Sequence, residues 1–106
     1  MVKDKKKTSK NYTYWILITY VFIIMKTAKY FTATWCGPCK TFKPVVFELI
    51  EDGYSIEIID LDEQQDIAVK YRISSVPTMV IEENGIEVDR FIGALPKKQV
   101  IQKLID

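Results

Sequence analysis

From Lys29 onward, short apolar runs alternate with stretches in which apolar residues recur at helical spacing. The short runs predict strands over Lys29–Ala33, Tyr54–Leu61, Met79–Ile81 and Ile86–Ile92. The helical spacing predicts helices over Cys36–Asp52 and Glu63–Tyr71, and a last helix that Pro96 opens. This order predicts an α/β protein with a central mixed β-sheet flanked by helices.

Individual residues refine these elements. The first helix carries an apolar stripe, encloses Pro44, and is expected to end at Gly53. Asp62 is a candidate N-cap for the second helix, and Asn84-Gly85 predicts a tight hairpin turn. Two apolar sets are expected to be buried. They are Ile56, Ile58, Ile59 and Leu61 on both faces of the second strand, and Val100, Ile101, Leu104 and Ile105 on one face of the last helix.

The first 25 residues differ from the rest, so we divide the chain into a leader, residues 1–25, and a domain, residues 26–106. Five of the first ten residues are lysines, and residues 12–24 are almost wholly apolar. This pattern is typical of a signal sequence or a membrane anchor, although a bilayer span takes roughly 20 residues. The segment could instead supply an additional first strand and helix, or Met25 could be the natural start.

Charge and composition exclude two classes of function. The domain carries ten basic and thirteen acidic residues, which gives no electrostatic case for nucleic-acid binding. The chain has no histidine, which excludes nucleophilic catalysis by a Cys-His pair. At 106 residues it is long enough for one core, and we expect a monomer.

Both cysteines of the chain lie in Trp35-Cys36-Gly37-Pro38-Cys39-Lys40, at the start of the first predicted helix. Two thiols at this spacing can close and reopen a small disulfide ring. The unpaired N–H groups and the positive end of a helix N-terminus stabilise a thiolate. We therefore expect Cys36 to be the reactive cysteine and Cys39 the resolving one.

Three other interpretations of the cysteine pair compete with this one. A chance pair of buried cysteines is disfavoured by the Gly-Pro between them, a turn-forming pair that begins a helix. A zinc site takes about four ligands, and this chain offers two cysteines and no histidine, so we predict no metal. A purely structural disulfide would close so short a loop that it would restrict the unfolded chain little. Thiol–disulfide exchange is the interpretation we favour.

The cysteine motif, together with several others in the same order and spacing, resembles the thioredoxin family from about Lys29 to the C-terminus. Pro44 matches the proline inside the family's active-site helix, and Val76-Pro77-Thr78 resembles the loop whose proline is cis and lies against the disulfide. Asn84-Gly85 matches the hairpin turn, and Gly93-Ala94 matches the small residues beside the substrate groove. The resemblance implies a thioredoxin fold.

The resemblance also implies a docking surface for disulfide-containing protein substrates. Its residues would be Trp35, Gly37, Pro38, Val76, Pro77, Gly93 and Ala94. Trp35 would cover one side of this surface, and the Val76 backbone would pair with an extended substrate. A bare backbone at Gly93 would let the partner chain approach.

The chain departs from the family six residues before Cys36, where a buried aspartate is usual and this sequence has Tyr30. A buried carboxylate could carry a proton to or from Cys39, whereas tyrosine, with an ordinary pKa of about 10, is a poor substitute. Ile58 replaces the lysine that usually accompanies the aspartate. We expect that water carries the proton instead, or that the attack by Cys39 is slower than is typical of the family.

The implied function is reduction of disulfides in other proteins by dithiol exchange. No bound cofactor is needed, but a thioredoxin-reductase-like partner must return the electrons. We expect a cytoplasmic protein, with membrane anchoring or export through residues 12–24 as the alternative. A tethered reductant outside the cytoplasm and a binding module without exchange activity are the alternative functions.

Overall fold

The computed structural model describes residues 26–105, so the predictions for the leader lie outside the described residues. The described chain forms, in order, β1 (Thr27–Thr32), α2 (Gly37–Glu51), β2 (Ile56–Asp60), α3 (Gln65–Lys70), β3 (Thr78–Glu83), β4 (Ile86–Ile92) and α4 (Lys97–Ile105). The predicted order of strands and helices is confirmed.

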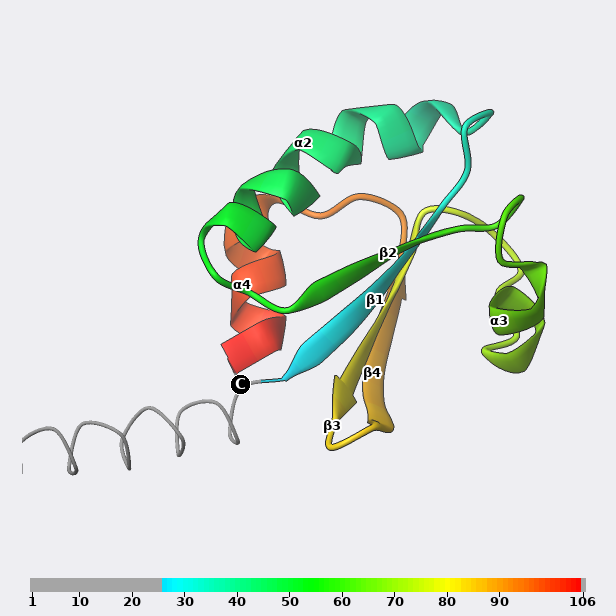
Figure 1. The fold of residues 1–106 in the computed structure, drawn as a ribbon. Helices are drawn as coiled ribbons and strands as arrows, with labels where there is room; N and C mark the ends of the chain where they lie inside the picture. The colour runs from blue at the N-terminus through cyan, green and yellow to red at the C-terminus, as the bar shows by residue number, and fades with distance from the viewer. Residues whose placement is uncertain (1–25, 106) are drawn as a thin grey trace, which may run out of the picture.

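The four strands form one mixed sheet in the order β2-β1-β3-β4 (Figure 1). β1 pairs in parallel with β2 and antiparallel with β3, and β4 runs antiparallel to β3. At the hairpin between β3 and β4, Asn84 and Gly85 have φ values of +55° and +81°. Positive φ at both central positions is what a tight hairpin turn requires, so the predicted turn is confirmed.

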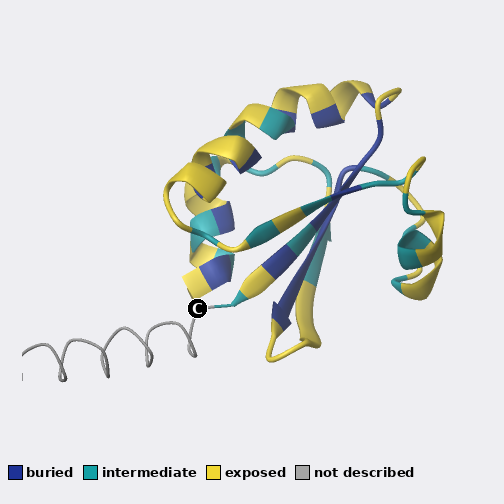
Figure 2. Cartoon of the chain, in the orientation of Figure 1, coloured by how far each residue is buried: buried dark blue, intermediate teal, exposed yellow. Residues whose placement is uncertain are grey.

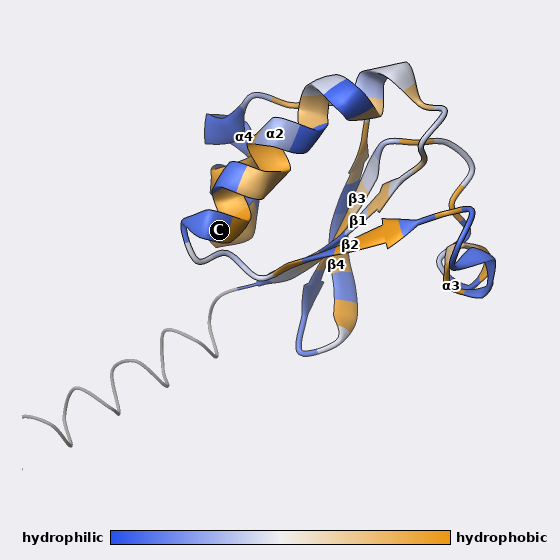
Figure 3. Ribbon diagram, turned by 45° about the horizontal axis from the view of Figure 1, so that its top comes forward, coloured by the Kyte–Doolittle hydropathy of each residue, from blue (hydrophilic) through white to orange (hydrophobic). Residues whose placement is uncertain are grey.

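Helices α2 and α4 cover one face of the sheet (Figure 1), and the main core lies between them and the strands. Its fully enclosed members come from β1, β3 and both helices: Tyr30, Phe42, Val46, Leu49, Met79, Ile81, Val100 and Leu104. Figure 2 shows this burial concentrated on β3, on β1 and on the inward sides of the two helices. Figure 3 shows apolar and hydrophilic segments alternating along the helices.

A smaller apolar cluster lies on the opposite face of the sheet, built on Phe31, Ile59 and Val80. Apolar side chains from α3 and the segment after it pack against this cluster, while α3 itself lies beyond the carboxyl end of β2 (Figure 1). Among residues 26–105, no helix combines the length and the apolar character that a bilayer crossing requires.

Three sequence-based expectations are wrong in detail. β2 is an edge strand of the described sheet and ends before Leu61, and of the four apolar residues expected to be buried there only Ile59 is fully buried. Asp62 does not cap α3, because the Asp60 carboxylate accepts the Asp62 N–H at 2.8 Å and the helix starts later, after Gln64. Ile105 lies at the last turn of α4 and is 54% exposed.

Candidate functional site

The two cysteines lie where β1 ends and α2 begins. The chain turns out of β1 with a hydrogen bond from the Cys36 N–H to the Ala33 carbonyl at 3.2 Å. Cys36 then occupies the N-cap of α2 with extended backbone angles, and Pro38 lies in the first turn. Proline suits this position because the first N–H groups of a helix lack intrahelical partners.

Cys36 and Cys39 are joined in a disulfide with a Cα separation of 5.3 Å. The Cys39 N–H donates to Cys36 Sγ at 3.1 Å, so one unpaired helix donor already points at this sulfur. Such a donor, together with the positive end of the helix dipole, favours negative charge on Cys36 when the disulfide opens. The division of roles between Cys36 and Cys39 stays a prediction, which this geometry supports.

The loop before β3 lies against the disulfide. Val76 packs on Cys36 and Cys39, and Cys36 Sγ lies 3.6 Å from the Val76 carbonyl oxygen. The Val76–Pro77 peptide bond is cis, as the resemblance implied, and Pro77 is buried. The Thr78 hydroxyl donates to the Ser75 carbonyl at 2.6 Å, which closes this loop on itself.

The end of β4 is tied to the same loop. The Gly93 N–H donates to the Pro77 carbonyl at 2.8 Å. Gly93 has φ +93°, a conformation that side chains rarely adopt, and a Cβ built there would meet open space. Space beside the disulfide loop is therefore left free at Gly93, as a partner chain would need.

The remaining predicted docking residues differ in exposure. Trp35 is 67% exposed next to Cys36, which fits a contact surface better than a core position. Gly37, Pro38 and Ala94 are also exposed. The disulfide itself is nearly enclosed, with Cys36 4% and Cys39 1% exposed.

Two features of the site were missed from the sequence. Ile92, at the end of β4, is 62% exposed and pairs with Thr78, so it extends the apolar surface beside Gly93. The Tyr30 hydroxyl donates to the Cys39 carbonyl at 3.4 Å, although the two residues lie on different elements. Burial raises the pKa of Tyr30, and the neighbouring Thr32 hydroxyl opposes this shift.

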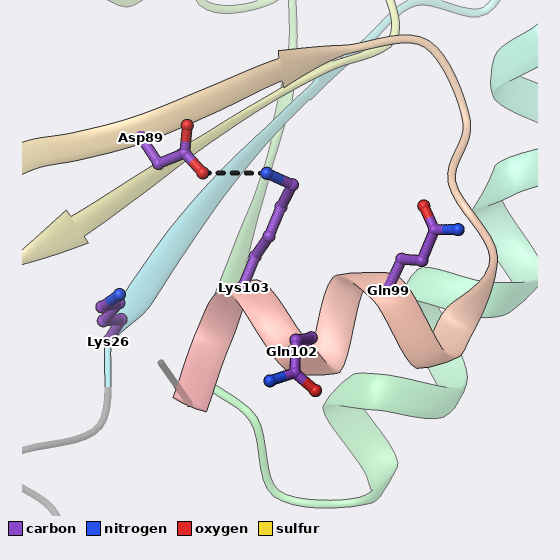
Figure 4. Close-up of a pocket in the computed structure, with 5 residues that line it drawn as sticks. All are labelled: Lys26, Asp89, Gln99, Gln102 and Lys103. Atoms are coloured by element: carbon purple, nitrogen blue, oxygen red, sulfur yellow. Dashed lines mark hydrogen bonds and ion pairs between the residues drawn. The ribbon is translucent and has the colours of Figure 1, made fainter.

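A separate cavity of about 410 Å³ lies between β4, α4 and the start of β1 (Figure 4). It is lined by Lys26, Asp89, Gln99, Gln102 and Lys103, and Lys103 donates to Asp89 at 3.0 Å. It contains none of the predicted site residues and lies at the end of β1 away from the cysteines.

The fold and the Cys36–Cys39 disulfide at a helix N-terminus define a thiol–disulfide oxidoreductase. The family model for thioredoxin matches residues 6–106. The chain belongs to the thioredoxin family.

Relatives and solved structures agree with this assignment. The chain is 43% identical to thioredoxin of Chlorobaculum thiosulfatiphilum over 77 residues, which is 70% of this chain and 71% of the relative. It is 40% identical to a thioredoxin of Staphylococcus aureus, with coverage of 70% and 74%. A mutant thioredoxin from Halobacterium salinarum superposes with a TM-score of 0.70 at 31% identity, covering 79% of this chain and 76% of the other. For Schistosoma mansoni thioredoxin the TM-score is 0.69 at 35% identity, with coverage of 77% and 78%.

Proposed function

We propose that this protein reduces disulfides in other proteins, with Cys36 as the attacking sulfur and Cys39 as the resolving one. The observation that carries the proposal is the position of Cys36 Sγ at the N-cap of α2, 3.1 Å from the Cys39 N–H. Negative charge on Cys36 is favoured there, and a thiolate is the attacking species in disulfide exchange.

The reaction takes place in two exchanges. The Cys36 thiolate attacks one sulfur of the substrate disulfide, a mixed disulfide forms, and the other substrate sulfur leaves as a thiolate. Cys39 loses its proton to water and attacks Cys36, so that the second substrate sulfur leaves and Cys36–Cys39 closes. The substrate gains two electrons and two protons, and the protein is left oxidised.

A second protein must return the electrons to Cys36–Cys39. We propose a reductase of the thioredoxin-reductase kind as this donor, and no bound cofactor or metal in the chain itself. Pairs of the thioredoxin type have potentials of about −270 mV, low enough to reduce most protein disulfides other than the most stable. The cytoplasm, where thiols are kept reduced, is the compartment that suits this chemistry.

The test is a protein-disulfide reduction assay on two matched serine variants. Cys36→Ser removes the attacking sulfur, and we expect no reduction above background. Cys39→Ser keeps the attack but removes the resolution, so a mixed disulfide with the substrate should accumulate and be visible by mass. Full activity of Cys36→Ser, or a trapped substrate on Cys36→Ser rather than on Cys39→Ser, contradicts the proposed roles.

A further inference from the structure

Tyr30 carries a buried hydroxyl, which takes no part in the two exchanges of the proposed reaction. Its side chain is fully enclosed on the face of β1 that α2 covers. The ring packs edge-on against Phe42 of α2, with 5.7 Å between centroids and 78° between planes. The packing therefore fixes the position of the ring and of its hydroxyl.

The Tyr30 hydroxyl contacts the backbone of the resolving cysteine, Cys39. The Tyr30 hydroxyl lies 3.4 Å from the Cys39 carbonyl oxygen, a long O–H···O contact. Hydrogen bonds at reaction centres are often long in the resting state and tighten when the reacting complex forms. This contact ties the first turn of α2, at Cys39, to the central strand of the sheet.

A second buried hydroxyl lies two residues further along β1. Thr32 is 2% exposed, and its Oγ1 has no hydrogen-bond partner of good geometry within residues 26–105. Buried polar groups are normally paired, so the unsatisfied Thr32 oxygen marks a polar spot in an otherwise apolar layer. The Thr32 hydroxyl influences the pKa of Tyr30, so the two hydroxyls lie near each other and Thr32 can compete with the Cys39 carbonyl for the Tyr30 hydroxyl.

The deeply buried charged side chains lie too far away to hold the Cys39 carbonyl, because they are on the other face of the sheet. Glu82 is the carboxylate most deeply buried in residues 26–105, and it is engaged with Lys29 at 3.0 Å and Tyr71 at 2.6 Å. These groups lie with Val80 on the opposite face of the sheet from Tyr30. The Cys39 backbone is thus held by a neutral group.

We propose that Tyr30 is a positioning residue for the resolving step, because its hydroxyl keeps the Cys39 carbonyl in place while the disulfide is open. The inference rests on the proposed role of Cys39. In the oxidised protein the S–S bond itself fixes Cys39. In the mixed disulfide that constraint is gone, and small misplacements of a reacting atom cost large factors in rate. Tyr30 neither gains nor loses a proton in the step.

The experiment follows the two exchanges separately, using a small aromatic disulfide that releases one coloured thiolate at each exchange. With the reduced full-length protein, the first phase reports attack by Cys36 and the second reports resolution by Cys39. Tyr30→Phe removes the hydroxyl and keeps the ring. We expect an unchanged first phase and a second phase about fivefold slower, the effect of losing one neutral hydrogen bond.

Two control variants separate positioning from packing. Thr32→Val removes the competing acceptor and should leave the second phase unchanged or faster. Phe42→Leu loosens the ring packing and should lower thermal stability more than Tyr30→Phe does. The proposal is overturned if Tyr30→Phe leaves the second phase unchanged or slows both phases equally. It is also overturned if Thr32→Val slows the second phase as much.

Failure of the proposed function gives a different result from failure of this inference. If the wild-type protein shows no first phase, the attack by Cys36 itself is contradicted. If the wild type shows both phases and Tyr30→Phe does not slow the second phase selectively, only the positioning role of Tyr30 is contradicted.

Discussion

Trp35 and Phe47 are both large aromatic residues with about half or more of their surface exposed, at 67% and 48%. They differ in position. Trp35 directly precedes Cys36, whereas Phe47 lies in the middle of α2, away from the helix N-terminus. An exposed aromatic next to a reactive group is typical of a contact that is completed by a partner.

The matched pair tests the docking surface. We expect Trp35→Ala to lower kcat/KM for a protein substrate by about tenfold, since truncating a central aromatic contact costs about 1.4 kcal/mol or more. Phe47→Ala should leave kcat/KM within about twofold. Steady-state kinetics with one protein substrate measure both. Equal losses in the two variants would show that Trp35 has no special role in docking.

At the residue scale, the sequence predicted which residues lie together around the cysteines but not all of their contacts. The order of Trp35, the cysteines, Pro77 and Gly93 was enough, because the motif spacing brings them to one end of the sheet. For Tyr30, the sequence indicates only that it stands where the family usually has an aspartate. Its bond to the Cys39 carbonyl depends on how α2 packs across β1, and no local pattern encodes that packing.

At the element scale, α4 is held to the molecule by a few side chains. Val100 and Leu104 are fully buried one turn apart, while Ile105 next to them is largely exposed. Lys97 adds ion pairs to Glu48 at 3.5 Å and Asp52 at 3.0 Å on α2. Exposed pairs of this kind contribute little, so apolar burial carries most of the attachment of α4.

Leu104→Ala should therefore lower the free energy of unfolding by about 2–5 kcal/mol, the range for deleting a buried leucine side chain. Ile105→Ala is the matched control and should change it by about 0.5 kcal/mol or less. Urea unfolding followed by circular dichroism measures both. Similar losses in the two variants would mean that α4 is seated differently from the arrangement described.

Element boundaries show where local sequence signals are sufficient. The helix stop at Gly53 and the turn at Asn84-Gly85 were predicted because positive φ strongly favours glycine and asparagine, and both are confirmed at +103°, +55° and +81°. The start of α3 was predicted wrongly, because the sequence does not show which aspartate side chain accepts a backbone N–H in the turn before the helix. The Asp60 side chain is the one that accepts a backbone N–H there.

At the scale of the whole molecule, two of the charged contacts illustrate how stability depends on pH. The hydrogen bond from Lys103 lowers the pKa of Asp89 below its ordinary value of 3.8, against a smaller opposing effect of burial. For Lys29, burial is the largest single effect and lowers the pKa. The hydrogen bond and ion pair with Glu82, together with the charges of Tyr71 and Glu57, outweigh burial and raise the pKa above 10.5. The Asp89 contact therefore changes stability in acid, and the Lys29 contact changes it in alkali.

The direction of each pKa shift determines the pH range in which the contact stabilises the folded protein. A carboxyl whose pKa is lowered by folding adds stability above pH 3.8 that is lost as the pH falls through the folded-state pKa. An ammonium whose pKa is raised adds stability below pH 10.5 that is lost as the pH rises through its folded-state value.

We expect Asp89→Asn to be less stable than wild type by about 0.5 kcal/mol at pH 7, as for other partly exposed ion pairs. That difference should close at pH values well below 3.8, where wild-type Asp89 is also protonated. Urea unfolding at pH 7 and in acid measures the effect. A difference that persists unchanged in strong acid would assign it to something other than the charge on Asp89.

The two ends of the described chain lie together. The Lys26 N–H donates to the Leu104 carbonyl at 3.4 Å, so the entry to β1 meets the last turn of α4 (Figure 1). The cysteines follow the far end of β1, about 20 Å away along a six-residue strand. A tag, fused domain or solid support joined just after α4 would therefore lie at the opposite end of β1 from the disulfide, and protein immobilised there should still accept bulky substrates.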